Sequence, residues 1–125
     1  MKAVLDAGAL IAVDRRDRGF GAMLRVLQRQ GTPLRASVAA VAQVWRDGSR
    51  QANLARVLTG VGIAPLAAGD SKRIGELLTT ARMADVVDAH VALLVDPGDM
   101  LFTSDPADLK ALTDARGITA NVLTV

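Results

Sequence analysis

Residues 84–94 read Ala-Asp-Val-Val-Asp-Ala-His-Val-Ala-Leu-Leu, and the rest of the chain is interpreted from this segment. Its spacing predicts an amphipathic helix whose apolar face, carrying Val87 and Val91, packs into a core. Asp85 and Asp88 are three residues apart, so on such a helix they share one face. Two carboxylates at the rim of an apolar helix indicate a polar site.

Apolar runs alternate with helical patterns along the rest of the chain. Five strands are predicted, over residues 1–5, 34–36, 61–63, 100–103 and 119–125. Helices are predicted from Ala9 and over 20–30, 37–45, 50–58, 72–82, 84–94 and 104–115, with Asp70 or Ser71 capping the helix 72–82. The alternation predicts an α/β fold, a three-layer α/β/α sandwich with a central, mainly parallel sheet of about four to five strands. The 125 residues fit one domain, residues 1–125.

Composition narrows the chemistry of any site. The chain has no Cys and only one His, His90, which excludes thiolate metal sites, thiol nucleophiles and multi-His metal sites. Any metal is therefore bound by oxygen, which favours Mg²⁺ or Mn²⁺. Aromatic residues make up 2% of the chain, so base stacking on aromatic side chains is not expected.

The basic residues are mostly arginines. Of the 15 Lys and Arg residues only Lys2, Lys72 and Lys110 are lysines, which leaves twelve arginines. Arginine binds phosphate bidentately, so a phosphodiester partner is one interpretation, and the codon bias of a high-GC genome is another. No signal peptide precedes the first apolar run and no run reaches the roughly 18 residues of a membrane span, so we expect a cytoplasmic protein with no membrane partner.

Two further acids follow predicted strands. Asp6 ends the first strand, and Asp105 comes two residues after the strand 100–103. Because the carboxyl ends of parallel strands form the ligand-binding edge of an open α/β sheet, Asp6, Asp105 and the acids of the helix 84–94 are expected to converge there. Clustered carboxylates repel one another unless protons or cations lie between them, which favours a divalent metal.

Each acid also has a structural interpretation that the sequence leaves open. Asp105 can be the N-cap of its helix, and Asp85, Asp88 and Asp108 can complement helix dipoles. His90 is interpreted as structural or as a surface residue. The other aspartates are interpreted as helix caps and turn residues: Asp14, Asp17, Asp47, Asp70, Asp96, Asp99 and Asp114.

Three segments, in order, resemble motifs of PIN domains across the whole chain. Residues 5–10, Leu-Asp-Ala-Gly-Ala-Leu, resemble the family's opening motif. Residues 88–92, Asp-Ala-His-Val-Ala, resemble its acidic helix, and residues 103–109, Thr-Ser-Asp-Pro-Ala-Asp-Leu, resemble its last acidic segment. PIN domains of this size are commonly VapC toxins of VapBC-type toxin–antitoxin pairs, which are Mg²⁺- or Mn²⁺-dependent ribonucleases and usually dimers.

The resemblance implies roles for individual residues. Asp6, Asp88 and Asp105 would be catalytic acids that hold the metal, with Asp85 as an auxiliary acid and Asp108 as a more distant one. Residues 37–43 match the segment that usually carries a Glu, and here Gln43 stands in its place. Gln keeps an oxygen ligand but loses the charge, which is expected to weaken metal binding and cleavage.

Three functional hypotheses follow. The first is a metal-dependent endoribonuclease with RNA as substrate, an antitoxin protein as partner and a homodimeric assembly. Arg46, Arg50 and Arg56 would then be RNA-contact candidates, although they can equally be solubilising surface residues. The second is a PIN-like module that binds RNA or a protein without cutting, because of Gln43. The third, a phospho-acceptor receiver domain, is disfavoured because Asp6 has no acidic neighbour and no Lys follows Lys110.

Overall fold

The computed structural model describes residues 1–125 and contains one five-stranded, fully parallel sheet. Its strands are β1 (Ala3–Leu5), β2 (Leu34–Ser37), β3 (Val61–Ala64), β4 (Met100–Thr103) and β5 (Asn121–Thr124), in the spatial order β3-β2-β1-β4-β5. All three residues of β1 are 0% exposed, as expected for a central strand covered on both faces. Leu5 is in register with Ala36 of β2 and Phe102 of β4.

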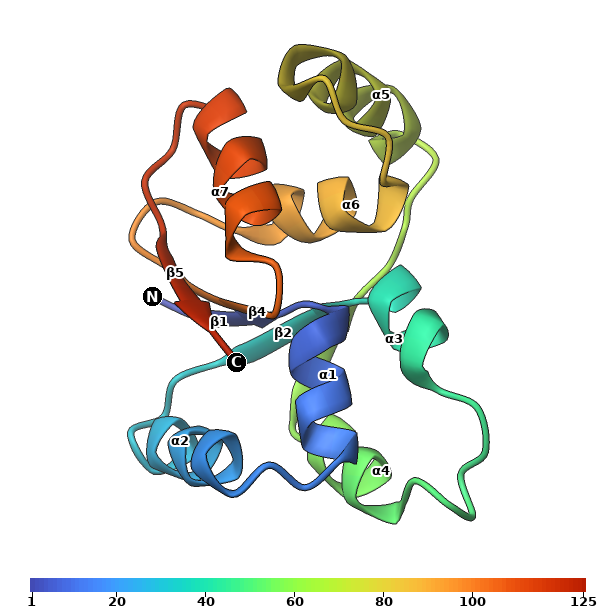
Figure 1. Ribbon diagram of the computed structural model, residues 1–125, viewed down its shortest axis with the longest axis vertical. Coiled ribbons are helices and arrows are strands. Elements are labelled where there is room, and N and C mark those ends of the chain that lie inside the picture. Colours follow the sequence, from blue (N-terminus) through green and yellow to red (C-terminus); the bar gives the residue numbers. More distant parts are fainter.

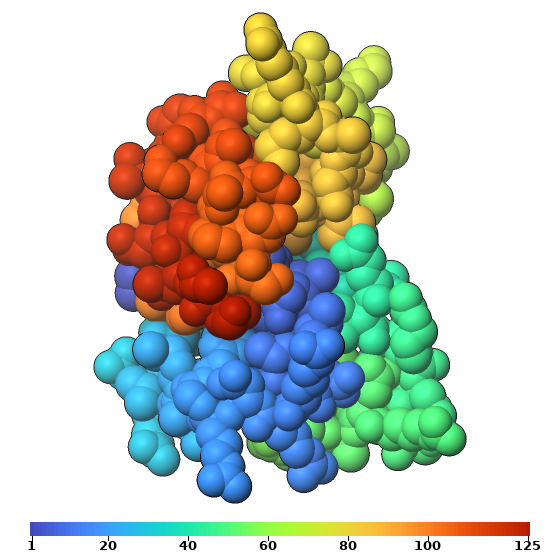
Figure 2. All heavy atoms as spheres, viewed as in Figure 1, coloured from blue at the N-terminus to red at the C-terminus, as the bar shows by residue number.

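Helices cover both faces of the sheet (Figure 1). One layer contains α1 (Ala7–Asp14), α2 (Arg18–Arg29), α3 (Val38–Val44) and α4 (Ala52–Leu58). The other contains α5 (Asp70–Ala81), α6 (Val86–Leu94) and α7 (Pro106–Ala115). Figure 2 shows the consequence for the surface, where the first half of the chain forms one end of the molecule and the second half forms the other. The predicted three-layer α/β/α architecture is confirmed.

The core is aliphatic, as the composition predicts. One cluster of 25 buried residues, mostly Ala, Val and Leu, runs through the sheet and both helical layers. Phe20 of α2 and Phe102 of β4 are its aromatic members, with ring centroids 5.2 Å apart. None of the helices is long and apolar enough to span a membrane.

Several element ends differ from the sequence prediction. The helix predicted over 84–94 begins at Val86, because the backbone of Asp85 is extended and its side chain caps the helix. The helix predicted over 72–82 begins at Asp70 after Gly69, and the Asp70 carboxylate accepts a hydrogen bond from the preceding Ala67 amide, so the predicted cap at Asp70 or Ser71 is wrong. The helix 50–58 begins at Ala52, and the last strand covers only Asn121–Thr124.

His90 is a structural residue, as one of the two interpretations held. It is 2% exposed on α6, and its Nδ1 lies 2.6 Å from the Ser37 Oγ at the end of β2. The same Ser37 hydroxyl caps α3 by accepting hydrogen bonds from the amides of Ala39 and Ala40, as the sequence predicts. The pair therefore joins α6, β2 and the start of α3.

A partly buried ion pair joins the starts of the two central strands. Lys2 precedes β1 and Asp99 precedes β4, and the Lys2 Nζ lies 2.6 Å from the Asp99 Oδ2. The backbone amides of Lys2 and Asp96 also donate to the Asp99 carboxylate. Burial by itself would raise the pKa of Asp99, but these hydrogen bonds and the charge of Lys2 outweigh it and hold that pKa below its ordinary value.

Replacing Asp99 is expected to destabilise the fold. Asp99→Ala leaves two amides and an ammonium group without their shared acceptor, which costs about 2–3 kcal/mol in the free energy of unfolding. Asp96→Ala removes the exposed partner of the same Lys2 side chain and is expected to cost less than about 1 kcal/mol. Urea unfolding of the two variants measures the difference, and equal losses would show that Asp99 has no special role.

Candidate metal centre

The candidate site lies where the chain reverses its direction across the sheet. From the central strand β1 the chain adds β2 and β3 on one side, and it then crosses to add β4 and β5 on the other. In an open parallel sheet, ligands bind outside the carboxyl ends of the strands at such a point. Asp6 follows β1 directly, and Asp105 follows β4 after one intervening residue.

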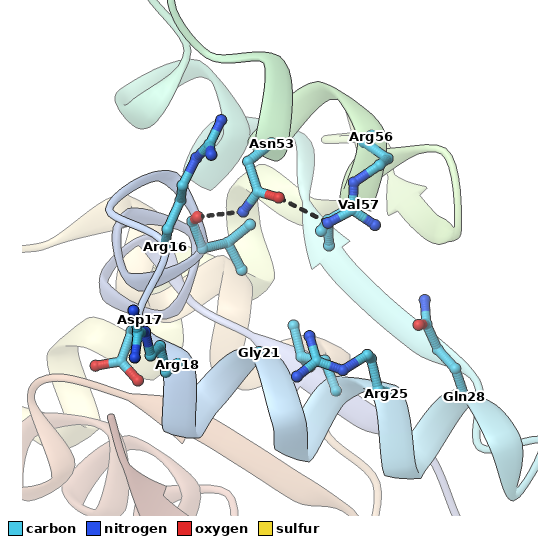
Figure 3. A pocket seen from close by; sticks show the side chains of 11 residues that line it. Arg16, Asp17, Arg18, Gly21, Arg25, Gln28, Asn53, Arg56 and Val57 are labelled. Carbon is cyan, nitrogen blue, oxygen red and sulfur yellow. Dashed lines mark hydrogen bonds between the residues drawn. The ribbon is translucent and has the colours of Figure 1, made fainter.

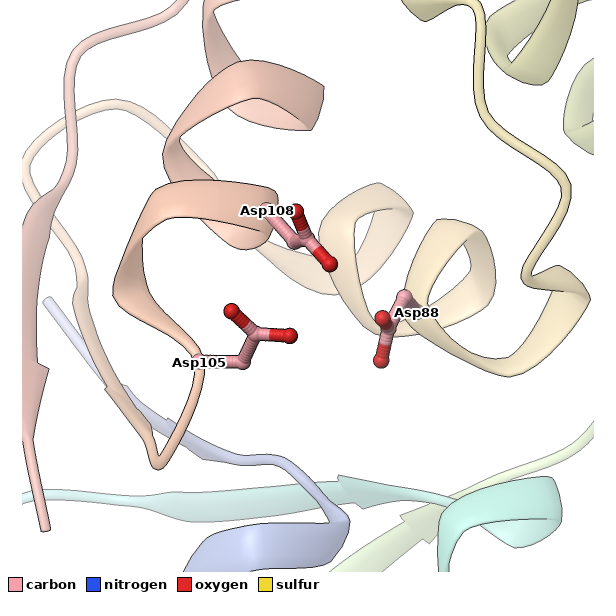
Figure 4. A group of neighbouring side chains, drawn as sticks. All are labelled: Asp88, Asp105 and Asp108. Atoms are coloured by element: carbon pink, nitrogen blue, oxygen red, sulfur yellow. The ribbon is translucent and has the colours of Figure 1, made fainter.

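Three carboxylates gather at this point. Asp88 lies in the first turn of α6, Asp105 is the N-cap residue of α7, and Asp108 lies in the first turn of α7. One carboxylate oxygen from each lies within 4.8 Å of the other two, and the three side chains face a common space in Figure 4. The positive ends of two helix dipoles thus meet at three negative charges.

Asp105 does not act as a cap through its side chain. Although it holds the N-cap position, its carboxylate makes no capping hydrogen bond. Its backbone amide instead donates to the Thr103 hydroxyl at 2.8 Å, which fixes the turn from β4 into α7. The Asp105 carboxylate is therefore free to face Asp88 and Asp108.

Asp85 has a different place from the one predicted. It precedes α6 rather than lying on it, and its Oδ1 accepts a hydrogen bond from the Asp88 amide at 3.0 Å. Asp85 thus lies at the start of the helix, as its structural interpretation holds, and it also makes a capping hydrogen bond that the sequence did not lead us to expect. Its charge still acts on the site, because it is one of the causes that raise the pKa of Asp88.

Asp6 lies beside the three carboxylates but is not one of them. It is 4% exposed, and its Oδ1 accepts a hydrogen bond from the Ala9 amide at 2.8 Å, which caps α1. Burial raises the pKa of Asp6, while hydrogen bonds from the Thr103 hydroxyl and the amides of Ala9 and Gly8 act in the opposite direction. Thr103 therefore connects Asp6 to Asp105, and the metal-ligand role of Asp6 remains a prediction.

The electrostatics of the group show strong mutual repulsion. Burial is the largest cause that raises the pKa of Asp88, and the charges of Asp85, Asp6, Asp105 and Asp108 add to it in that order, so that together they bring this pKa to about 6. A hydrogen bond with Asp105, together with the charge of that residue, raises the pKa of Asp108. Protons or a cation between these carboxylates would relieve the repulsion.

The other predicted site residues lie on the layer formed by α1–α4. Gln43 is an exposed residue on α3, and α3 packs against both α1 and α6. Arg46 follows α3 and donates to the carbonyl oxygens of Ala42 and Trp45 at the end of that helix. Arg50 lies in the loop before α4 and pairs with Asp47. Arg56 lies on α4, separated from Arg46 and Arg50.

The contact between Gly8 and Ser104 is not predicted from the sequence. A Cβ atom on Gly8 would lie 2.6 Å from the Ser104 Cβ, closer still to its Oγ, and 3.0 Å from its backbone nitrogen. Only glycine at position 8 lets the turn that carries Asp105 pack against the start of α1. A glycine two residues after a strand-end acid is the one signal in the sequence that could have indicated this contact.

The pKa of Asp88 predicts a pH-dependent stability in the absence of divalent cations. The pKa of this acid is about 6 in the folded chain against 3.8 as its ordinary value, so the folded state binds more protons between these limits. Stability therefore falls as pH rises through this interval. Asp88→Asn removes the effect and is expected to raise stability by about 1 kcal/mol at pH 7.5 in EDTA, allowing for solvent screening.

Thermal unfolding from pH 4 to pH 8 measures this difference. Asp114→Asn, an exposed acid of α7 paired with Lys110, is the matched control and should change stability little at any pH. The same pH dependence in the Asp88→Asn variant and the natural protein would contradict the electrostatic description of the group.

Gly8→Ala is expected to distort the site. The overlap with Ser104 forces the turn at Asp105 to move and costs about 1–3 kcal/mol of stability. Ser104→Gly in the same chain removes the two closest atoms and should recover part of the loss. Gly75→Ala on α5 is the control, because a Cβ there meets open space and favours the helix. Equal stability of the two alanine variants in urea unfolding would contradict the close approach.

Comparisons with known proteins place the fold. No family model matches the sequence, and no curated protein matches it. Among solved structures the chain is similar to one in the crystal structure of VapBC2 from Rickettsia felis bound to a DNA fragment from their promoter. The TM-score is 0.72 at 14% sequence identity, and the alignment covers 100% of this chain and 99% of the other. The chain therefore has the PIN-like fold that its sequence motifs predict.

Proposed function

We propose that residues 1–125 form one PIN-like domain that acts as a metal-dependent endoribonuclease of the VapC type. The observation that carries the proposal is the group of Asp88, Asp105 and Asp108, whose carboxylate oxygens lie within 4.8 Å of one another. The group lies at the carboxyl ends of β1 and β4, where ligands bind in this class of fold. The motifs and the fold support the same interpretation.

The donor set fits a hard divalent cation. It consists of carboxylate oxygens alone, with no nitrogen or sulfur ligand, which suits Mg²⁺ or Mn²⁺ better than zinc. Asp88, Asp105 and Asp108 would hold the cation, and Asp6 is the alternative third ligand that the sequence motifs favour. Such a cation neutralises charge on a phosphodiester and makes water a stronger nucleophile at neutral pH.

The chain's own residues keep the acids in position. Asp85 caps α6 and orients the turn that carries Asp88. Thr103 accepts from the Asp105 amide and donates to Asp6, so both strand ends are fixed relative to each other. Arg46 and Arg50 follow α3 and remain candidate RNA contacts.

The structural neighbour supports a protein partner. It is a VapBC2 complex bound to promoter DNA, and by analogy we propose that this chain pairs with an antitoxin protein. A homodimer and a cytoplasmic location belong to the same proposal.

The second candidate function is a PIN-like module with weak or no cleavage. Gln43 favours it, because this exposed residue of α3 stands where the family usually has a Glu. One negative charge fewer weakens the attraction for a divalent cation. Asp108 and Asp85 provide other acids near Asp88.

Substitution of the acids tests the enzymatic proposal. Asp88→Asn and Asp105→Asn are expected to reduce Mn²⁺-dependent cleavage of an RNA of mixed sequence. Loss of a residue that only hydrogen-bonds to a metal ligand costs roughly 10–100-fold in activity, and the loss of a ligand itself should cost more. Asp6→Asn and Asp108→Asn are compared in the same assay, and the third metal ligand is the acid whose replacement reduces cleavage more. Asp114→Asn is the control, and unchanged cleavage by Asp88→Asn would contradict the assigned site.

Gln43→Glu separates the two candidate functions. If the natural protein is an attenuated nuclease, restoring the acid is expected to raise cleavage at low Mn²⁺ concentration by about tenfold or more. The gain must disappear when Asp88→Asn is added to the same chain, which shows that the activity belongs to this site. A natural protein that cleaves as well as Gln43→Glu would favour the fully active enzyme.

A further inference from the structure

A cleft of about 300 Å³ lies between α2 and α4, next to the end of α1. Four of the chain's twelve arginines line it: Arg16, Arg18, Arg25 and Arg56. Figure 3 shows that Arg18 and Arg25 come from the α2 side and Arg56 from the opposite α4 side. We call this cavity, defined by the four arginines, the arginine cleft.

The arginine cleft has an excess of positive charge, with four arginines against one acid, Asp17. The five ion pairs of the structure involve Lys2, Arg50, Arg73 and Lys110, and none of them involves an arginine of the cleft. Asp17, the acid at its edge, caps α2 by accepting a hydrogen bond from the Phe20 amide at 2.8 Å. Four arginines and one acid thus line this cavity, and none of the four arginines forms an ion pair.

Two hydrogen bonds hold one of these arginines in place. The Asn53 Nδ2 donates to the carbonyl oxygen of Val13 at the end of α1, at 2.7 Å. This bond directs the Asn53 Oδ1 toward Arg56, whose Nη2 donates to it at 2.7 Å. Asn53 is therefore a positioning residue that presents the Arg56 guanidinium to the cleft (Figure 3).

Arg16 occupies a backbone position that favours glycine. Its φ is +58°, and the amides of Arg16 and Asp17 donate to the carbonyl oxygens of Val13 and Ala12, which is the hydrogen-bond pattern of a Schellman motif. A side chain with a Cβ atom is disfavoured in this left-handed conformation. An arginine at this position adds positive charge beside the cleft at the expense of stability.

The lining indicates which part of a ligand is recognised. The cleft contains no aromatic residue, so it offers nothing on which a base can stack. Its apolar lining is limited to Val13, Leu24 and Val57, which provides no deep pocket for the apolar anchor of a peptide. Arginines from both sides of the cleft can each bind a phosphate group through two parallel hydrogen bonds of the guanidinium.

The cleft and the acidic group lie at opposite ends of α1. Asp6 caps the start of this helix beside Asp88 and Asp105, whereas Val13 and Arg16 at its other end line the cleft. Eight residues of helix span about 12 Å. A bound strand of RNA can therefore reach from one site to the other.

We infer that the arginine cleft binds backbone phosphates of the RNA whose scissile bond lies at the acidic group. The inference rests on the proposed function, because it takes RNA as the substrate. The acidic group repels phosphates, so the affinity for the strand comes from cations elsewhere on the chain. Binding through phosphates alone is independent of base sequence and steeply dependent on salt.

The test measures binding of a short fluorescein-labelled single-stranded RNA by anisotropy, in EDTA and over a series of salt concentrations. Arg25→Ala combined with Arg56→Ala is expected to weaken binding about tenfold or more and to lower the salt slope by about 1.4, which is about 0.7 for each lost phosphate contact. Arg29→Ala, at the far end of α2 and outside the cleft, should change affinity less than about twofold.

Position 16 offers a second test that separates strain from binding. Arg16→Gly is expected to raise the melting temperature by roughly 4 °C and to weaken RNA binding severalfold. Arg82→Gly is the matched control, since Arg82 follows α5 with a φ of +56° and does not line the cleft. It should raise the melting temperature similarly and leave RNA binding unchanged.

Three results would overturn the inference. RNA binding unaffected by the cleft variants is one, and equal weakening by Arg29→Ala and Arg82→Gly is another, because that would reflect net charge alone. Displacement of the RNA by a lower concentration of an oligoglutamate peptide is the third, since it would assign the cleft to an acidic protein segment. Because binding is measured in EDTA, a failure here is distinguishable from a failure of the cleavage experiments at Asp88.

Discussion

Repulsion among carboxylates is the constraint on which the site depends. Asp88, Asp105 and Asp108 are held with oxygens within 4.8 Å of one another, although burial and neighbouring charges already raise the pKa of Asp88 to about 6. A fold keeps such a group only if the surrounding structure is rigid enough to resist separation. A divalent cation removes the repulsion, which is why the same arrangement indicates metal binding.

The rigidity comes from both ends of the central strand pair. At the carboxyl ends, Thr103 connects Asp6 to the Asp105 turn, and Gly8 lets that turn pack against α1. At the other ends, the ion pair of Lys2 and Asp99 joins the residues that precede β1 and β4. Each of these contacts joins β1, or a residue next to it, to β4 or the turn that follows it. The two strands between which the chain reverses its direction are therefore fixed at both of their ends.

The sequence predicts the class and order of the elements well, because apolar runs and helical spacing are local signals. It also predicts that acids after β1 and β4 meet, since parallel strands end at one edge. It fails where a side chain's partner is distant in the chain. Asp99 forms an ion pair with Lys2 in addition to its turn contact with Asp96, and α2 and α4 meet around the arginine cleft. Nothing in their local spacing indicates these contacts.

Titration with Mn²⁺, followed by the electron paramagnetic resonance signal of the free ion, shows whether the acidic group is a metal centre. We expect saturable Mn²⁺ binding to the natural protein, abolished by both Asp88→Asn and Asp105→Asn and unchanged in Asp114→Asn. If Asp88→Asn bound Mn²⁺ as tightly as the natural protein, the acidic group would not be the metal centre.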